Sequence, residues 1–187
     1  MISFSQAQEN LKALFAGWLD EQTMQTERVG LQQALGRYLA SPVFGSLDLP
    51  RDNVSAMDGY ALSPLSPDAV SSGEEYRLIG ESRAGEPYSG SALNAGECVR
   101  IFTGAVVPNS ANTVVIQEDV SVSSDQAVVI NEAVRIGANI RLQGEEIAAG
   151  VEIASAGQQM TPNMVPLLAS QGVGEVEVVR MLRVAFL

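Results

Sequence analysis

Two turn segments of the chain place oxygen-bearing side chains directly before glycine: Asp58 precedes Gly59, and Thr103 precedes Gly104. Glycine allows a sharp backbone turn, and an aspartate there can accept hydrogen bonds from nearby amides. Such a carboxylate could also orient a water molecule or help to hold a cation. A threonine hydroxyl beside backbone amides suits hydrogen bonding to an oxyanion, and it suits satisfying its own turn equally well. The residue types alone favour the local role for Asp58.

A third group lies further along the chain, where Arg141 is followed by Gly144, Glu145 and Glu146. An arginine can hold a phosphate through two parallel hydrogen bonds, and the chain has a single lysine, Lys12, as an alternative cation of that type. The glutamate pair could contact a metal ion or simply face solvent. These residues are candidates for binding an anionic substrate.

The composition excludes several classes of function. The formal net charge is −11, from 22 acidic and 11 basic residues. Binding to nucleic acid or to an anionic membrane normally needs a basic patch, so we expect neither partner. The chain has no histidine, which removes histidine-based nucleophile activation, general-base catalysis and metal ligation.

The single cysteine, Cys98, cannot form an internal disulfide or a cysteine-rich zinc site, and we expect a buried free thiol. The N-terminus has no basic segment before an apolar run, so it does not match a signal peptide. No apolar run approaches membrane-spanning length. These features are typical of a cytoplasmic protein in a reducing compartment.

Three segments carry helix signals. Ser5 with Gln8 matches a capping box, and apolar residues at helical spacing follow, so we expect a helix with one buried face. Residues 31–39 predict a second, short helix. Thr161 and Pro162 predict the N-cap and first residue of a third helix.

Between these segments the chain consists of short β-type runs separated by turn residues. The predicted strands are residues 76–79, 113–117, 120–122 and 128–130, and the last two flank a turn typical of a hairpin. We therefore expect an α+β fold of mainly short strands in two interleaved subdomains. A β-rich subdomain, residues 46–138, is inserted into a helix-containing subdomain built from residues 1–45 and 139–180.

Four sequence blocks, in the same order along the chain, resemble the molybdopterin molybdenumtransferase family, which includes MoeA and the E domain of gephyrin. The first and clearest is residues 49–62, Leu-Pro-Arg-Asp-Asn-Val-Ser-Ala-Met-Asp-Gly-Tyr-Ala-Leu. Residues 96–105, continuing to 119, resemble the Thr-Gly-Ala segment of the family. Residues 139–147 resemble its Arg-x-x-Gly-Glu-Asp-Ile segment, and residues 34–40 give a weaker match upstream.

The resemblance implies roles for the residues that match. Asp58 aligns with the active-site aspartate of the family and Thr103 with its functional threonine, so both are predicted catalytic residues. Ser55, Arg141, Glu145 and Glu146 form the predicted substrate-binding set, and we expect Ser55 to shape the turn rather than to react. Glu146 stands where the family typically has Asp, and Arg51-Asp52-Asn53-Val54 replaces its more typical Pro-Phe-Asp-Asn.

The family activity that the resemblance implies is insertion of molybdate into adenylylated molybdopterin, with release of AMP, in molybdenum cofactor biosynthesis. It also implies Mg²⁺, with ligands that we expect largely outside this chain, and a homodimer whose cleft is shared between subunits. Residues 181–187 resemble the first strand of a following α/β domain. We therefore expect the N-terminal half of the enzyme, inactive alone.

Two other classes of function remain open at this point. The chain could be a non-catalytic dimerisation and interaction module of the same family, with the substitutions at Val54 and Glu146 marking lost chemistry. It could also be an unrelated β-rich ligand-binding domain. The presence of Asp58, Thr103, Arg141 and Glu145 together favours the enzyme.

Overall fold

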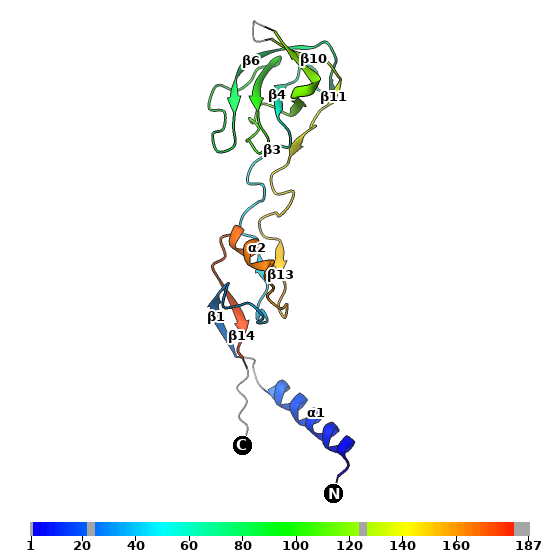
Figure 1. Ribbon diagram of the computed structural model, residues 1–187, viewed down its shortest axis with the longest axis vertical. Helices are drawn as coiled ribbons and strands as arrows, with labels where there is room; N and C mark the ends of the chain where they lie inside the picture. Colours follow the sequence, from blue (N-terminus) through cyan, green and yellow to red (C-terminus); the bar gives the residue numbers. More distant parts are fainter. Residues whose placement is uncertain (1, 22–24, 124–126, 182–187) are drawn as a thin grey trace. The chain divides into compact units, whose positions relative to one another are not determined.

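The computed structural model describes residues 2–21, 25–123 and 127–181, and these form an α+β fold composed mostly of short strands (Figure 1). The chain divides into two units. The terminal unit combines Met1–Ser46 with Gly150–Leu187, and the inserted unit is Leu47–Ala149. No helix in the described ranges is long and apolar enough to cross a membrane.

The inserted unit contains a six-stranded sheet in the order β8-β4-β7-β6-β10-β9. Its strands are β4 (Gly59–Ser63), β6 (Glu75–Ser82), β7 (Glu97–Ile101), β8 (Thr113–Ile116), β9 (Val120–Val122) and β10 (Ala127–Ile130). All neighbours pair antiparallel except β6 and β7, which are parallel. The four predicted strands are confirmed, and so is the β9–β10 hairpin, in which Val128 lies opposite Val122.

The centre of this sheet is buried on both faces, which explains its continuous apolar runs. Along β4, Tyr60 and Leu62 belong to one core cluster, whereas Ala61 belongs to another. Successive side chains of a strand point to opposite faces, so the two clusters cover the two faces of the sheet. Cys98 of β7 is a buried free thiol, as predicted, and burial raises its pKa to about 12.

Two short strand pairs complete the inserted unit. β5 (Ala69–Val70) pairs with β11 (Val134–Arg135), and β3 (Val54–Ser55) pairs with β12 (Ile140–Arg141). The sequence-based division assigned residues 139–149 to the chain ends. In the structure they lie in the inserted unit, because β12 hydrogen-bonds to β3 there.

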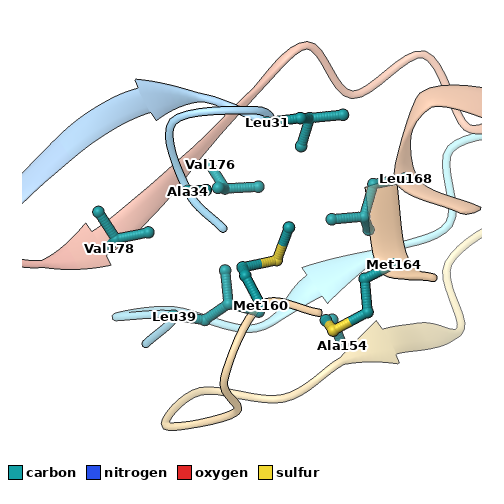
Figure 2. Packing of buried hydrophobic residues seen from close by; sticks show 9 residues of the cluster. All are labelled: Leu31, Ala34, Leu39, Ala154, Met160, Met164, Leu168, Val176 and Val178. Carbon is teal, nitrogen blue, oxygen red and sulfur yellow. The ribbon is translucent and has the colours of Figure 1, made fainter. Parts of the chain in front are cut away.

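The terminal unit brings together segments from both chain ends around one core. β1 (Thr26–Gly30) pairs with β14 (Glu175–Val179), and β2 (Val43–Phe44) pairs with β13 (Glu152–Ala154). Helix α2 (Met164–Ser170) lies beside them. Figure 2 shows the buried cluster that these elements share: Leu31, Ala34, Leu39, Ala154, Met160, Met164, Leu168, Val176 and Val178.

The third predicted helix is confirmed as α2, with a later start. Its N-cap is Asn163 and its first residue Met164, so Thr161 and Pro162 form the turn that leads into it. Met164 and Leu168 are buried against the core, as the helical spacing predicts.

The first predicted helix is confirmed as α1 (Phe4–Glu21), but the predicted cap is wrong. The hydroxyl of Ser3 accepts a hydrogen bond from the Gln6 amide at 3.3 Å, so Ser5 lies inside the helix. The expected burial of one face is also not seen, since Leu11 and Leu14 are 66% and 71% exposed. The side chains of residues 17–21 lie outside the described part.

The predicted helix at residues 31–39 is wrong. The segment is a series of turns in which Gly36 has a φ of +75° and the Gly36 amide donates to the Met160 carbonyl. Leu39 then forms an isolated bridge with Val178. Leu31 and Ala34 both reach the core from this turn, so it reproduces helical spacing without a helix. The strand expected at residues 181–187 lies, beyond Met181, outside the described residues.

Candidate active site

The predicted catalytic residues meet at one edge of the six-stranded sheet. β4 begins at Gly59, which lies opposite Ile101 at the end of β7 and Ile116 at the end of β8. Asp58, just before β4, is therefore beside the loop that carries Thr103. Asp58 and Thr103 come together because β4 and β7 pair antiparallel in this register.

Gly59 is required here for a reason other than a turn. It lies in a strand, and it is not among the glycines with positive φ. A Cβ at this position would lie 2.0 Å from the Val115 carbonyl oxygen of the neighbouring strand. The close approach of β8 therefore excludes any side chain, and it fixes where Asp58 enters the sheet.

Asp58 and Thr103 form a double hydrogen bond. The backbone N–H and the hydroxyl of Thr103 both donate to Oδ1 of Asp58, each at 2.8 Å. Both residues are exposed to solvent, and Oδ2 of Asp58 accepts no hydrogen bond within the described residues. One carboxylate oxygen is therefore fixed in place while the other stays open to a ligand.

These contacts favour the ionised carboxylate. The Thr103 amide is the main cause of a lowered pKa for Asp58, followed by the Thr103 hydroxyl, and the charge of Arg100 adds to them. Partial desolvation opposes this shift without cancelling it. Asp58 is thus a hydrogen-bond acceptor at neutral pH.

The two loops of the site are also joined through Ser55. Its amide donates to the Ala105 carbonyl at 2.9 Å, and its carbonyl accepts from Gly104, whose φ is +80°. The Ser55 side chain is buried, and its hydroxyl donates to the Met57 carbonyl at 2.6 Å. This geometry supports the predicted turn-shaping role, whereas its assignment to substrate binding stays a prediction.

Arg141, Glu145 and Glu146 form a cluster of their own. Arg141 Nε donates to Glu145 at 2.8 Å, and its Nη2 pairs with Glu146. Glu146 and then Glu145 raise the pKa of Arg141, which in turn lowers the pKa of Glu145. The two carboxylates use Nε and Nη2, so a phosphate could bind through Nη1, and a two-point clamp on the guanidinium would compete with Glu146 at Nη2.

This cluster is tethered to the Asp58 loop through the backbone. Arg141 lies opposite Val54 in the β3–β12 pair, and the Ala56 amide donates to the Asn139 carbonyl at 2.9 Å. Within the described ranges, no side-chain hydrogen bond or ion pair links Arg141 to Asp58 or Thr103. The structure thus brings Asp58 and Thr103 into contact, and it places the arginine cluster one strand pair away.

The described residues do not form a complete metal site. Among them, no three His, Cys, Asp or Glu side chains gather where they could hold a metal ion. Asp58 offers one open carboxylate oxygen, and the two glutamates are paired with Arg141. Magnesium prefers several oxygen ligands, so this donor set does not fit Mg²⁺, and no chemical step is assigned to it.

The sequence prediction missed Arg100, Phe102 and Gln117, which surround the Asp58 turn. The Arg100 guanidinium lies 4.9 Å from the centre of the Phe102 ring, and it donates to Gln117 Oε1 at 2.5 Å. The signal was available in the sequence: an arginine stands between the apolar residues Val99 and Ile101. A charged residue there needs partners, and these lie at the site.

Comparison with known proteins agrees with this architecture. A family described as the MoeA N-terminal region, domains I and II, matches residues 2–172. The chain is 36% identical over 165 residues to molybdopterin molybdenumtransferase from Haemophilus influenzae, covering 87% of this chain and 39% of that protein. It is 34% identical over 180 residues to the protein of that name from Synechococcus elongatus, covering 95% of this chain and 43% of that protein.

Solved structures show the same fold. Two structures of a molybdopterin biosynthesis MoeA protein from Pyrococcus horikoshii superimpose with TM-scores of 0.74 and 0.73, at 26% and 30% identity. Each comparison covers 84% of this chain and 40% or 42% of the other. The chain thus spans about two-fifths of the length of its relatives. It belongs to the family of the MoeA N-terminal region.

Proposed function

We propose that this chain provides the N-terminal region of a molybdopterin molybdenumtransferase, which inserts molybdate into adenylylated molybdopterin and releases AMP in molybdenum cofactor biosynthesis. The observation that carries the proposal is the Asp58 carboxylate, with one oxygen held twice by Thr103 and the other open. Membership of the MoeA family supplies the reaction class.

Asp58 acts in this proposal by orienting water at the adenylate. Its lowered pKa keeps it ionised, so Oδ2 can accept a hydrogen bond from a water molecule. The water oxygen forms a new bond to the AMP phosphorus while the bond from that phosphorus to the molybdopterin phosphate oxygen breaks. AMP, which keeps the water oxygen, and molybdopterin phosphate are the two products, and the protons of the water pass to the product phosphates and to solvent. A carboxylate with a lowered pKa is a weak base, so the proposed role is positioning rather than proton abstraction.

The anionic substrates must approach a chain of net charge −11. Arg100 gives the site local positive charge, since its charge acts on Asp58, whereas the nearby Arg83 is paired with Glu81. Local cations and backbone amides can attract an anion despite the overall charge. The same net charge disfavours nucleic acids and anionic membranes as partners.

The remaining expectations from the resemblance become part of the same proposal. The active form is a cytoplasmic homodimer, and the ligands of Mg²⁺ lie largely outside this chain. Because the chain spans about two-fifths of its relatives, we expect no turnover from it alone.

A non-catalytic interaction module is the second candidate function. Exposed apolar side chains on α1, Leu11 and Leu14 among them, favour an interaction surface. The pairing of Arg141 with its own two glutamates is also what a chain without substrate contacts would show. Activity separates the two candidates.

The test is molybdate insertion by a chimera, in which this chain replaces the matching region of the Haemophilus influenzae relative. Asp58→Asn keeps an oxygen for Thr103 but removes the charge, and Asp68→Asn, at an exposed carboxylate of the same unit, is the matched control. We expect Asp58→Asn to lower insertion by about 100-fold or more and the control to have no effect. An inactive but folded chimera favours the interaction module, and an active Asp58→Asn chimera removes Asp58 from the chemistry.

A further inference from the structure

We propose that Arg100 is a positioning residue that holds the Asp58 turn against Thr103. Arg100 lies in β7 directly opposite Tyr60 of β4, so its side chain reaches across to the start of β4. Its guanidinium touches neither Oδ1 nor Oδ2 of Asp58 through a hydrogen bond. It acts through its neighbours. The inference rests on the proposed function for its activity measurement alone.

The guanidinium holds the turn directly at Gly59 and indirectly, through Gln117, at Asp58. Its Nη1 donates to the Gly59 carbonyl at 3.1 Å, and its Nη2 donates to Gln117 Oε1 at 2.5 Å. The backbone amide of Gln117 donates in turn to the Asp58 carbonyl at 3.0 Å. Arg100 therefore bonds the Gly59 carbonyl and the side chain of Gln117, the residue whose backbone amide bonds the Asp58 carbonyl.

Two aromatic rings lie close to the guanidinium. The Arg100 Cζ lies 5.0 Å from the centre of the Tyr60 ring and 4.9 Å from that of the Phe102 ring. Arginine is favoured at such a position because its flat fork stacks on rings while it donates two hydrogen bonds. Phe102 directly precedes Thr103, so the same contact holds the Thr103 loop. Arg100 thus couples both partners of the Asp58–Thr103 bond.

The charged groups around this frame come from three elements. Arg100 belongs to β7, and Arg83 follows β6 and pairs with Glu81. Glu118 follows β8, and its carboxylate accepts a hydrogen bond from the side-chain Nε2 of Gln117 at 3.2 Å. Among these groups, Arg100 is the cation whose charge acts on Asp58. Its removal should therefore alter both the geometry and the titration of the carboxylate.

The first test uses Arg100→Met in this chain, with Arg135→Met as the matched control. Arg135 is exposed on β11, and its side chain makes no hydrogen bond or ion pair with any described residue. NMR measures hydrogen exchange of the Thr103 amide and the pH titration of the Asp58 carboxyl carbon. We expect about tenfold faster exchange and a higher pKa of Asp58 in Arg100→Met, with neither changed in the control.

Two further variants separate charge from geometry. Arg100→Lys keeps the charge but lacks the planar fork, so we expect it to restore the Asp58 titration in part and to leave Thr103 exchange fast. Gln117→Ala removes one acceptor of Arg100 at an exposed position, which keeps the test valid if Arg100→Met does not fold. It should accelerate Thr103 exchange in the same direction, by less. The proposal is overturned if Arg100→Met and Gln117→Ala both show the Thr103 exchange rate and the Asp58 titration of wild type. If Arg100→Lys shows the wild-type exchange rate of Thr103, Arg100 acts through its charge alone and not through its planar shape.

Activity of the chimera provides a separate readout. A positioning residue should affect kcat more than KM, so we expect Arg100→Met to lower kcat about tenfold with little change in KM. If the chimera with Arg100 intact is inactive, the proposed function fails, while the NMR results still decide the role of Arg100. If the chimera is active and Arg100→Met raises KM alone, Arg100 binds substrate and the positioning role is wrong.

Discussion

Thr103 donates its backbone N–H and its hydroxyl to the same oxygen of Asp58, each at 2.8 Å. Thr103 and Asp58 are 45 residues apart in the sequence: Thr103 follows the end of β7, and Asp58 precedes the start of β4. The amide bond depends only on the backbone path of the loop, whereas the hydroxyl bond depends on the side chain. The two contributions can therefore be separated by substitution.

Removal of the Thr103 hydroxyl should raise the pKa of Asp58 only in part. Thr103→Val has nearly the same shape and keeps the amide, which is the larger cause of the lowered pKa. We also expect about tenfold lower insertion activity in the chimera, the effect of one hydrogen bond to a charged group. An NMR titration of the Asp58 carboxyl carbon and a steady-state assay check the two outcomes.

Thr103→Ser is the control for this prediction, because it retains a hydroxyl at the same position. It should keep the wild-type pKa of Asp58 and most of the activity. Equal pKa values in Thr103→Val and wild type would mean that the hydroxyl bond does not form in solution.

The sequence singled out Asp58 and Thr103 as candidates but did not predict the frame around them. Each of the two lies in a block that resembles the family, and the resemblance, rather than the residue types, favoured a catalytic role, which stays a prediction. Arg100 was missed because its acceptor, the Gly59 carbonyl, lies 41 residues away and is brought near only by strand pairing. Arg141 and its glutamates were found as a group, but their mutual pairing depends on side-chain conformations that spacing does not fix.

Glu146 should weaken anion binding by Arg141. The two side chains are paired, at 42% and 54% exposure, so the bond is screened by solvent and contributes little to stability. Glu146→Gln frees part of the guanidinium, and we expect about two- to fivefold tighter binding of inorganic phosphate, measured by titration calorimetry. The control is Arg141→Met combined with Glu146→Gln, and this double variant should not bind phosphate more tightly than wild type. Unchanged phosphate affinity in Glu146→Gln would indicate that Arg141 is not an anion ligand in this chain.

The ionised Glu97 carboxylate should stabilise the fold when the pH is above the ordinary pKa of this group, 4.5. The Asn94 amide, at 2.8 Å, and the paired Arg77 lower the pKa of this buried carboxyl. The ionised form is favoured in the folded state, so its stabilisation is complete above about pH 4.5 and is lost as the pH falls through the lower, folded pKa. The Tm difference between wild type and Glu97→Gln should therefore be several degrees at pH 7 and should narrow below pH 4.5.

Glu75→Gln is the matched control, since Glu75 is exposed on β6 and makes no side-chain hydrogen bond or ion pair within the described part of the chain. Thermal unfolding between pH 7 and pH 3 compares the three proteins. A Tm difference for Glu97→Gln that is constant with pH would assign its effect to packing rather than to charge.

The secondary structure could be predicted where the pattern of apolar residues is compatible with a single type of element. The apolar run of β8 could be identified because Val114 and Val115 belong to the two different core clusters. In β10 burial alternates, with Val128 and Ile130 in a single cluster. Residues 31–39 could not, since Leu31 and Ala34 reach the core from a turn whose spacing equals that of a helix. The buried face expected for α1 failed for a different reason: helical spacing predicts an apolar stripe but not what covers it.

Leu168→Ala should destabilise the terminal unit by about 3 kcal/mol, because Leu168 is fully buried among Leu31, Met160 and Met164 (Figure 2). Leu35→Ala removes the same atoms at a position that is 43% exposed, and it should cost less than about 1 kcal/mol. Since Leu168 lies in the terminal unit, the Thr103 amide in the inserted unit should exchange as in wild type. Hydrogen exchange resolved by residue checks both units in one experiment. Equal loss of protection in the two units would mean that they unfold together, and that the core of the terminal unit also supports the candidate active site.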